Sequence, residues 1–144
     1  MADLTNFSIK ENSDEGVIFP VKVQGRKYPL AIRIYGSDSD VVKDFEKQRL
    51  RKLGLKTGKD IDSETLDELI ETQNETVFVR IGGIYEYDWK KKEVTNGDLL
   101  LNGKKLTNDK ASYALLIEAI PDVKDFVLEK SNERTNFLSS EKMN

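Results

Sequence analysis

The sequence predicts an α+β fold, in which an N-terminal β-hairpin packs on about four helices and the last two helices form a C-terminal pair broken at Pro121. Apolar residues recur at every second position in Val17–Val23 and again in Tyr28–Tyr35, which is typical of half-buried strands. Further along, apolar residues recur at the three- and four-residue spacing of a helix face. The chain has 144 residues, the length of one domain.

We expect residues 16–138 to form that single α+β domain. Residues 1–15 are polar with a weak alternation at Phe7 and Ile9, so a flexible N-terminus or a short edge strand is expected there. Residues 139–144 are expected to be a disordered tail.

The hairpin connection is predicted at Gln24–Lys27, and Pro20 places the first strand at a sheet edge because proline has no N–H to donate. A two-stranded hairpin is marginal in water, so its apolar face should pack on the helices. That face consists of Val17, Phe19, Val21, Val23, Leu30, Ile32 and Ile34.

The first long helix is predicted to begin after Gly36, where Ser37 or Ser39 can cap the free amides. It is predicted to end at Gly54, because glycine is favoured just past a helix C-terminus. Its apolar positions are Val41, Val42, Phe45, Leu50 and Leu53.

A second helix is predicted from Asp62, the N-cap, with Ile61 and Leu66 forming a hydrophobic staple. The β-branched and aromatic run Val77–Val79 also allows a change to a strand, and Gly82–Gly83 is predicted to end the element in either case.

Residues 84–98 contain an extended aromatic face made of Tyr85, Tyr87 and Trp89. Asn96–Gly97 is a turn signal, so a hairpin returning through Leu99–Leu101 is one interpretation.

The C-terminal helix pair follows an Asn-Gly turn at Asn102–Gly103, with Thr107 as the predicted N-cap. Pro121 cannot continue the first helix but suits the first turn of the next one. The apolar positions of the pair are Tyr113, Leu116, Ile117, Ile120, Val123, Phe126 and Val127, and the run ends at Phe137–Leu138.

Composition excludes several classes of function. The chain has no cysteine and no histidine, so it cannot form disulfides, thiolate metal sites or Ser–His and Cys–His nucleophilic pairs by itself. Its net charge of -3 gives no general attraction to nucleic acid or anionic lipid. It has no apolar stretch long enough to span a membrane and no signal peptide, so a cytoplasmic protein is expected.

Three groups of residues are candidate sites. Acidic residues cluster where a helix start and an exposed face favour them, so we interpret them as capping and solvated rather than catalytic. The loop Lys56–Lys59 has only one glycine, which is too few for a phosphate loop. The aromatic face beside Lys90–Lys92 fits stacking on single-stranded nucleic acid, contact with a protein, or ordinary core. The acidic groups are Asp60, Asp62, Glu64, Asp67, Glu68 and Glu71.

Short motifs follow one another along the domain. In chain order they are Phe19-Pro20 through Gly25-Arg26, Tyr35-Gly36-Ser37-Asp38-Ser39, the basic helix Lys43–Lys52, the acid-started helix Asp62–Val79, Asn102–Thr107, Pro121, and Arg134–Leu138. In this order they resemble the tail assembly chaperones of long-tailed bacteriophages. Family members often have a tryptophan directly after the second helix, whereas this chain has Gly82–Gly83 and the segment IYEYDWKKKEV there.

The resemblance implies a non-catalytic late protein of the host cytoplasm, which acts in virion assembly and is absent from the finished particle. Such chaperones bind the tape measure protein, keep its apolar helices soluble and help to recruit tail-tube subunits. The resemblance implies no cofactor, metal, membrane or nucleic acid, and it leaves self-association open. By position, the expected partner-binding residues are Phe126, Val127, Phe137 and Leu138, followed by Tyr85, Tyr87 and Trp89.

Three alternatives remain open on the sequence. A structural virion protein, for tail completion or head–tail joining, would copurify with intact particles. An enzyme using carboxylates would lose turnover when Asp60, Asp62 and Glu64 became amides. A single-strand nucleic-acid binder would bind most tightly at low salt.

Overall fold

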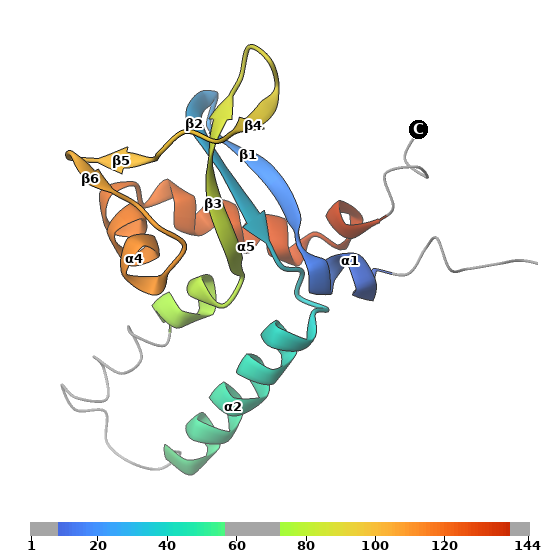
Figure 1. The fold of residues 1–144 in the computed structure, drawn as a ribbon. Helices are drawn as coiled ribbons and strands as arrows, with labels where there is room; N and C mark the ends of the chain where they lie inside the picture. Colours follow the sequence, from blue (N-terminus) through green and yellow to red (C-terminus); the bar gives the residue numbers. More distant parts are fainter. Residues whose placement is uncertain (1–8, 57–72, 139–144) are drawn as a thin grey trace, which may run out of the picture.

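The structure is a computed structural model that describes residues 9–56 and 73–138 (Figure 1). It has the predicted α+β architecture, with a four-stranded sheet and a separate two-stranded ribbon. Residues 73–78 are also helical. In chain order the elements are α1 (Lys10–Glu15), β1 (Val17–Val23), β2 (Arg26–Ile34), α2 (Asp40–Lys56), β3 (Ile81–Asp88), β4 (Glu93–Thr95), β5 (Leu100–Leu101), β6 (Lys104–Lys105), α4 (Lys110–Ala119), α5 (Asp122–Asn132) and the 3₁₀ helix η2 (Arg134–Phe137).

The main sheet is antiparallel throughout, in the order β1-β2-β3-β4. The predicted N-terminal hairpin is present, with a two-residue turn at Gln24–Gly25 whose φ angles are 51° and 82°. Two positive φ angles define the turn type that matches the twist of antiparallel strands. As predicted, β1 lies at the edge of the sheet, where Pro20 leaves no donor unpaired.

The sheet is larger than predicted, because β3 and β4 extend the hairpin. Gly82 and Gly83 do not end an element; they lie inside β3. The β3–β4 connection is at residues 89–92, so Asn96–Gly97 is not the hairpin turn. The turn at residues 89–92 is stabilised by Asp88, whose Oδ1 accepts the backbone N–H groups of Lys90 and Lys91 at 2.9 and 3.2 Å. In this turn the Asp88 side chain takes the place of a backbone hydrogen-bond acceptor, and the turn lies upstream of the Asn-Gly pair in the sequence.

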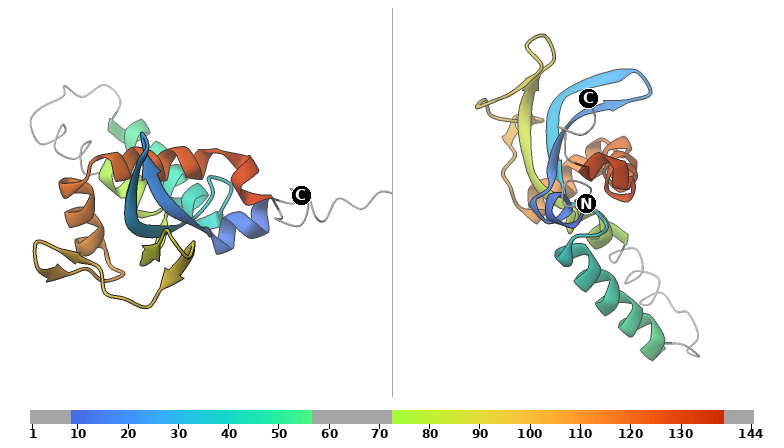
Figure 2. Two further views of the ribbon diagram at one scale, coloured as in Figure 1. Left: turned by 90° about the horizontal axis from the view of Figure 1, so that it is seen from above. Right: turned by 90° about the vertical axis from the view of Figure 1, so that its right-hand side faces the viewer.

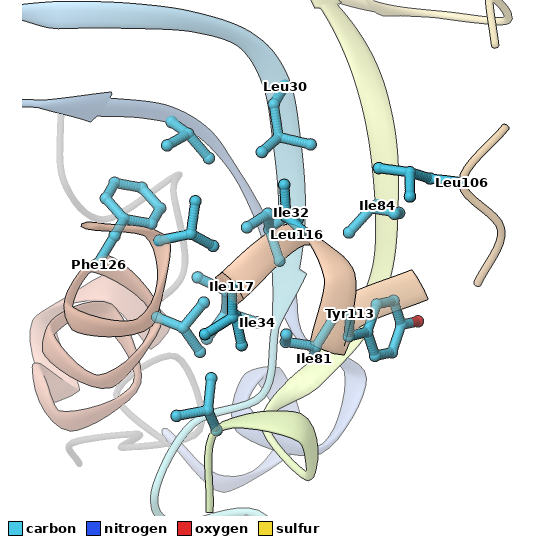
Figure 3. Close-up of a cluster of buried hydrophobic side chains, with 14 residues drawn as sticks. Leu30, Ile32, Ile34, Ile81, Ile84, Leu106, Tyr113, Leu116, Ile117 and Phe126 are labelled. Atoms are coloured by element: carbon cyan, nitrogen blue, oxygen red, sulfur yellow. The ribbon is translucent and has the colours of Figure 1, made fainter. Parts of the chain in front are cut away.

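One face of the sheet carries the core (Figure 3). Helix α5 crosses this face over β1 and β2, and α4 packs against α5. Leu30, Ile32 and Ile34 of β2 are buried as predicted, since they alternate toward the helices. The core cluster is Val21, Leu30, Ile32, Ile34, Val77, Ile81, Ile84, Leu106, Tyr113, Leu116, Ile117, Val123, Phe126 and Val127.

The N-terminal segment differs from its prediction. Residues 10–15 form helix α1, not a flexible start or an edge strand. The helix is held by the C-terminal end of the chain, because the Asn12 amide donates to the carbonyl of Phe137 at 2.7 Å and Ser13 is fully buried. Asn12 and Phe137 are distant in the sequence, so no local sequence pattern predicts this contact. Residues 1–8 and 139–144 lie outside the described residues.

Helix α2 begins as predicted, with the Ser39 hydroxyl accepting the N–H of Val42. It runs to Lys56 and therefore passes Gly54, because a glycine inside a helix costs only about 1 kcal/mol and does not by itself end it. The predicted apolar stripe is only partly buried: Val42 is 1% exposed, but Leu50 is 62% exposed. Figure 1 shows α2 leading away from the sheet. Among residues 9–56 and 73–138, no helix combines the length and apolarity that a membrane span needs.

The C-terminal helix pair is present, and Pro121 separates α4 from α5 as predicted. The β5–β6 turn at Asn102–Gly103 also matches its prediction. The N-cap of α4 is Asp109 rather than Thr107, because the Asp109 carboxylate accepts the N–H of Ser112 at 2.8 Å. The Thr107 hydroxyl instead donates a hydrogen bond to Asp109. This bond, followed by the one from the Ser112 N–H, lowers the pKa of Asp109.

Candidate functional site

The face of the sheet opposite α5 is the candidate site. Strand residues alternate between faces, and Ile84 points to the core, so Tyr85 and Tyr87 point to the opposite face. Figures 1 and 2 show that no helix of the described residues lies across this side of β1, β2 and β3. We call it the open face.

Cross-strand pairing identifies the members of the open face. Tyr85 pairs with Ala31, and Ala31 pairs with Pro20, so one row of side chains crosses three strands. Side chains of directly paired residues share a face. This side of the sheet carries two tyrosines, aliphatic groups and one arginine, and Ala31 among them is 0% exposed beneath its neighbours. The open face comprises Ile18, Pro20, Ala31, Arg33, Tyr85, Tyr87 and Val94.

The two glycines of β3 shape this face. A Cβ atom at Gly83 would lie 2.6 Å from the Tyr85 hydroxyl, and one at Gly82 would lie 2.9 Å from Cζ of Tyr35. Glycine thus lets the tyrosine rings lie against the strand instead of standing away from it. The Tyr85 hydroxyl also accepts a 3.5 Å hydrogen bond from Nε of Arg33. These contacts keep the aromatic groups half-buried and fixed in place.

Trp89 joins the two turns at one end of the sheet. Its indole N–H donates to the carbonyl of Tyr28 at 2.7 Å, and the Lys27 ammonium lies 5.3 Å from its ring centroid. Its ring meets Tyr87 edge-to-face, with centroids 5.0 Å apart and an angle of 75° between the planes. The β3–β4 turn is thereby attached to the start of β2 through the side chain of Trp89.

The structure separates the predicted partner-binding residues into two places. Tyr85, Tyr87 and Trp89 come together on or beside the open face. Phe126, Val127 and Phe137 are 6%, 0% and 1% exposed, so their side chains belong to the protein's own interior. Phe137 packs edge-to-face on Phe19 with centroids 6.3 Å apart. Leu138 follows η2 and is half-buried.

The acidic clusters and the phosphate-loop candidate of the sequence fall largely on residues that the structure does not describe. The acidic clusters between residues 60 and 71 and the loop residues 57–59 lie outside the described residues. Within residues 9–56 and 73–138, no three acidic side chains are placed to hold a metal ion.

Arg80 is the buried charged residue of the described chain, and sequence reasoning did not single it out. Its Nη1 donates to the carbonyl of Thr76 at 2.7 Å, and its Nη2 lies 3.7 Å from the Glu46 carboxylate. Burial lowers the pKa of Arg80, and the charge of Glu46 opposes that shift. These partners lie on α2 and on helical residues 73–78, so Arg80 holds α2 to the body of the protein.

Comparison of the chain with models of protein families, with curated proteins and with solved structures gave no match. Its function is therefore argued from its own residues. The candidate site is a partly aromatic sheet surface across which no helix of residues 9–56 and 73–138 lies.

Proposed function

We propose that this chain is a non-catalytic tail assembly chaperone of a long-tailed bacteriophage. It binds the tape measure protein in the host cytoplasm, keeps that protein soluble and helps to recruit tail-tube subunits during virion assembly. The order of motifs along residues 16–138 points to the family. The observation that carries the binding role is the open face, where Tyr85 and Tyr87 lie beside aliphatic side chains and no helix of the described residues crosses them.

The chemistry of the open face suits a temporary hold on an apolar helix. Tyrosine and tryptophan are enriched in protein contacts because they offer a large apolar area with one polar end. Here the Tyr85 ring lies against the strand at Gly83 and the Tyr87 ring packs on Trp89 before any partner arrives, so little conformational entropy is lost on binding. A sheet face has no deep pocket, and this favours release when the tail is assembled.

Co-expression tests the proposal. The tagged chain is produced together with the tape measure protein encoded in its gene neighbourhood and recovered by affinity capture. We expect the tape measure protein to stay soluble and to copurify. Replacing Tyr85 and Tyr87 by Ser should reduce the captured amount by about tenfold or more, because anchors of this kind dominate binding.

The matched control replaces Val41 and Leu50 by Ser, since both are exposed apolar residues of α2, away from the open face. This control should capture as much tape measure protein as wild type. Failure of the wild-type chain to capture the protein would contradict the proposal. Mass spectrometry of purified particles provides the second readout: recovery of this chain as a stoichiometric component would favour a structural virion protein instead.

A further inference from the structure

We propose that the end of the sheet next to Trp89 binds an acidic segment of the protein that the chain holds. This inference deepens the proposed function and rests on it, because it states the chemistry of the bound polypeptide. The surface combines Tyr87 and Trp89 with cations at the start of β2 and in the β3–β4 turn. We call these cations the basic end. The basic end consists of Arg26, Lys27, Lys90, Lys91 and Lys92.

The five cations of the basic end are all exposed to solvent. In the part of the chain that the structure describes, none of them forms a salt bridge, whereas Lys10, Arg49, Lys105, Lys110 and Arg134 all do. The whole chain has a net charge of -3, so this concentration of positive charge runs against the average composition.

Two chain segments distant in sequence build the basic end. Arg26 and Lys27 begin β2, and Lys90–Lys92 lie in the β3–β4 turn. The hydrogen bond from Trp89 to Tyr28 and the position of Lys27 over the indole ring connect the two segments. Figures 1 and 2 show both turns at the same end of the sheet. Two carboxylates border Lys90–Lys92 in the sequence. Asp88 accepts the N–H groups of Lys90 and Lys91 and so shapes the turn, and Glu93 is exposed at the start of β4.

Charge complementarity selects an acidic occupant. A cluster of cations bordering an aromatic surface attracts carboxylates and steers their approach, while apolar side chains of the same segment contact Tyr87 and the open face. An amphipathic segment with acidic residues beside its apolar stripe satisfies both parts of the surface.

The ring contacts favour polypeptide over single-stranded nucleic acid. Nucleic-acid binders of this kind present free aromatic faces on which bases stack. Here the Lys27 ammonium lies over the Trp89 ring, and Tyr87 meets the same ring at 75°. The aromatic pair is thus already engaged within the protein, and side-chain contacts at its edges remain.

Fluorescence anisotropy with synthetic probes tests the inference. The probes are a labelled helical peptide with a Leu/Phe stripe flanked by Glu, the same peptide with Lys in place of Glu, and labelled single-stranded DNA. We expect the Glu peptide to bind the full chain most tightly, and its binding to weaken as salt screens the charges. Tighter binding of the Lys peptide or of DNA would overturn the inference.

Charge reversal locates the site. The variant Lys90→Glu, Lys91→Glu, Lys92→Glu should bind the Glu peptide at least about tenfold more weakly than wild type. The control Lys43→Glu, Lys47→Glu, Lys52→Glu makes the same change of charge on exposed residues of α2 and should leave the affinity within about twofold. If the turn does not tolerate reversal, the Gln triple variant decides, with a smaller loss expected. If the turn variant and the α2 control weaken binding of the Glu peptide equally, the site is not at the basic end.

Capture of the tape measure protein separates this inference from the proposed function. If the wild-type chain captures no tape measure protein, the proposed function fails. If it does, and the charge-reversed variant captures as much as the α2 control, the proposed function stands and the acidic-segment inference fails.

Discussion

Phe137 provides the sharpest test of how the C-terminal end of the chain is used. Its side chain is 1% exposed, meets Phe19 edge-to-face, and lies under the segment that joins β2 to α2. The carbonyl of Phe137 also anchors α1 through Asn12. If these contacts are structural, replacing Phe137 by Ala must destabilise the whole protein and not simply remove a binding residue.

The expected loss can be estimated from burial. Truncation of a buried phenylalanine to alanine costs about 3–5 kcal/mol, including the cavity that is left. In a domain of this size that loss lowers Tm by about 10–15 °C. Phe137→Leu keeps most of the volume and should cost about 1–1.5 kcal/mol, and Leu138→Ala, at a half-buried position, should cost less than about 1 kcal/mol.

Urea unfolding measures these differences, with Trp89, the single tryptophan, as the fluorescent probe. Trp89 lies in the β3–β4 turn, so a shift in its transition reports on the cooperative unit and not on the C-terminus alone. An unfolding free energy for Phe137→Ala within about 0.5 kcal/mol of wild type would refute the reasoning. Combined with lost capture of the tape measure protein, that result would assign Phe137 to the partner.

Four further substitutions test three separate contacts. Gly36→Ala should lower the unfolding free energy by about 1–3 kcal/mol, because the new Cβ would lie 2.7 Å from Cβ of Ser13. Thermal melting should show that Arg80→Met lowers the unfolding free energy by about 1 kcal/mol and that Glu46→Leu lowers it more. The second change leaves a buried guanidinium without its carboxylate. A larger loss for Arg80→Met than for Glu46→Leu would contradict this pairing. The pKa of Asp109 is lowered in the fold, so its cap is fully stabilising above the ordinary pKa of 3.8 and is lost as pH falls through the folded value. Asp109→Asn should therefore flatten the acid side of the stability profile, and an unchanged profile would show that the cap contributes nothing.

The elements that the sequence predicts well have local causes. The N-terminal hairpin depends on an apolar alternation and on Gln24–Gly25, which takes up the two positive φ angles of a tight turn. The division between α4 and α5 depends on Pro121, whose missing N–H ends one helix and suits the start of the next. Each signal determines the structure of residues only a few positions away in the sequence, so it can be recognised without knowledge of the rest of the fold.

The errors arise where distant residues decide. Gly82 and Gly83 resemble an element end, but they lie in a strand because Tyr35 and Tyr85 cover them. Residues 10–15 are helical because the chain end packs on them, a contact between opposite termini. Asn96–Gly97 is a strong turn signal, yet Asp88 forms a turn earlier along the chain. In each case the local preference competes with a tertiary contact that lies outside any sequence window.

The candidate site is predictable in part for a related reason. Alternation alone places Tyr85 and Tyr87 on one side of a strand, and the structure shows them there. The spacing of apolar residues cannot show whether Phe126 and Phe137 are buried in the protein or contact a partner. An apolar helix face that packs on its own sheet has the same spacing as one that packs on a partner. The basic end requires two turns to be brought together, and this pairing is visible only in the fold.

The open face is bordered by features of the kind that limit self-association of apolar sheet surfaces. Exposed sheet surfaces and edges tend to pair with copies of themselves, and proteins limit this with charge, proline and irregular edges. Here Pro20 and a register shift interrupt the edge strand, and the cations of Lys90–Lys92 repel a second copy that approaches with the same end. An acidic partner turns that repulsion into attraction. If the proposed acidic segment binds here, the same cations disfavour self-association and select the partner by charge, where shape alone would accept many apolar helices.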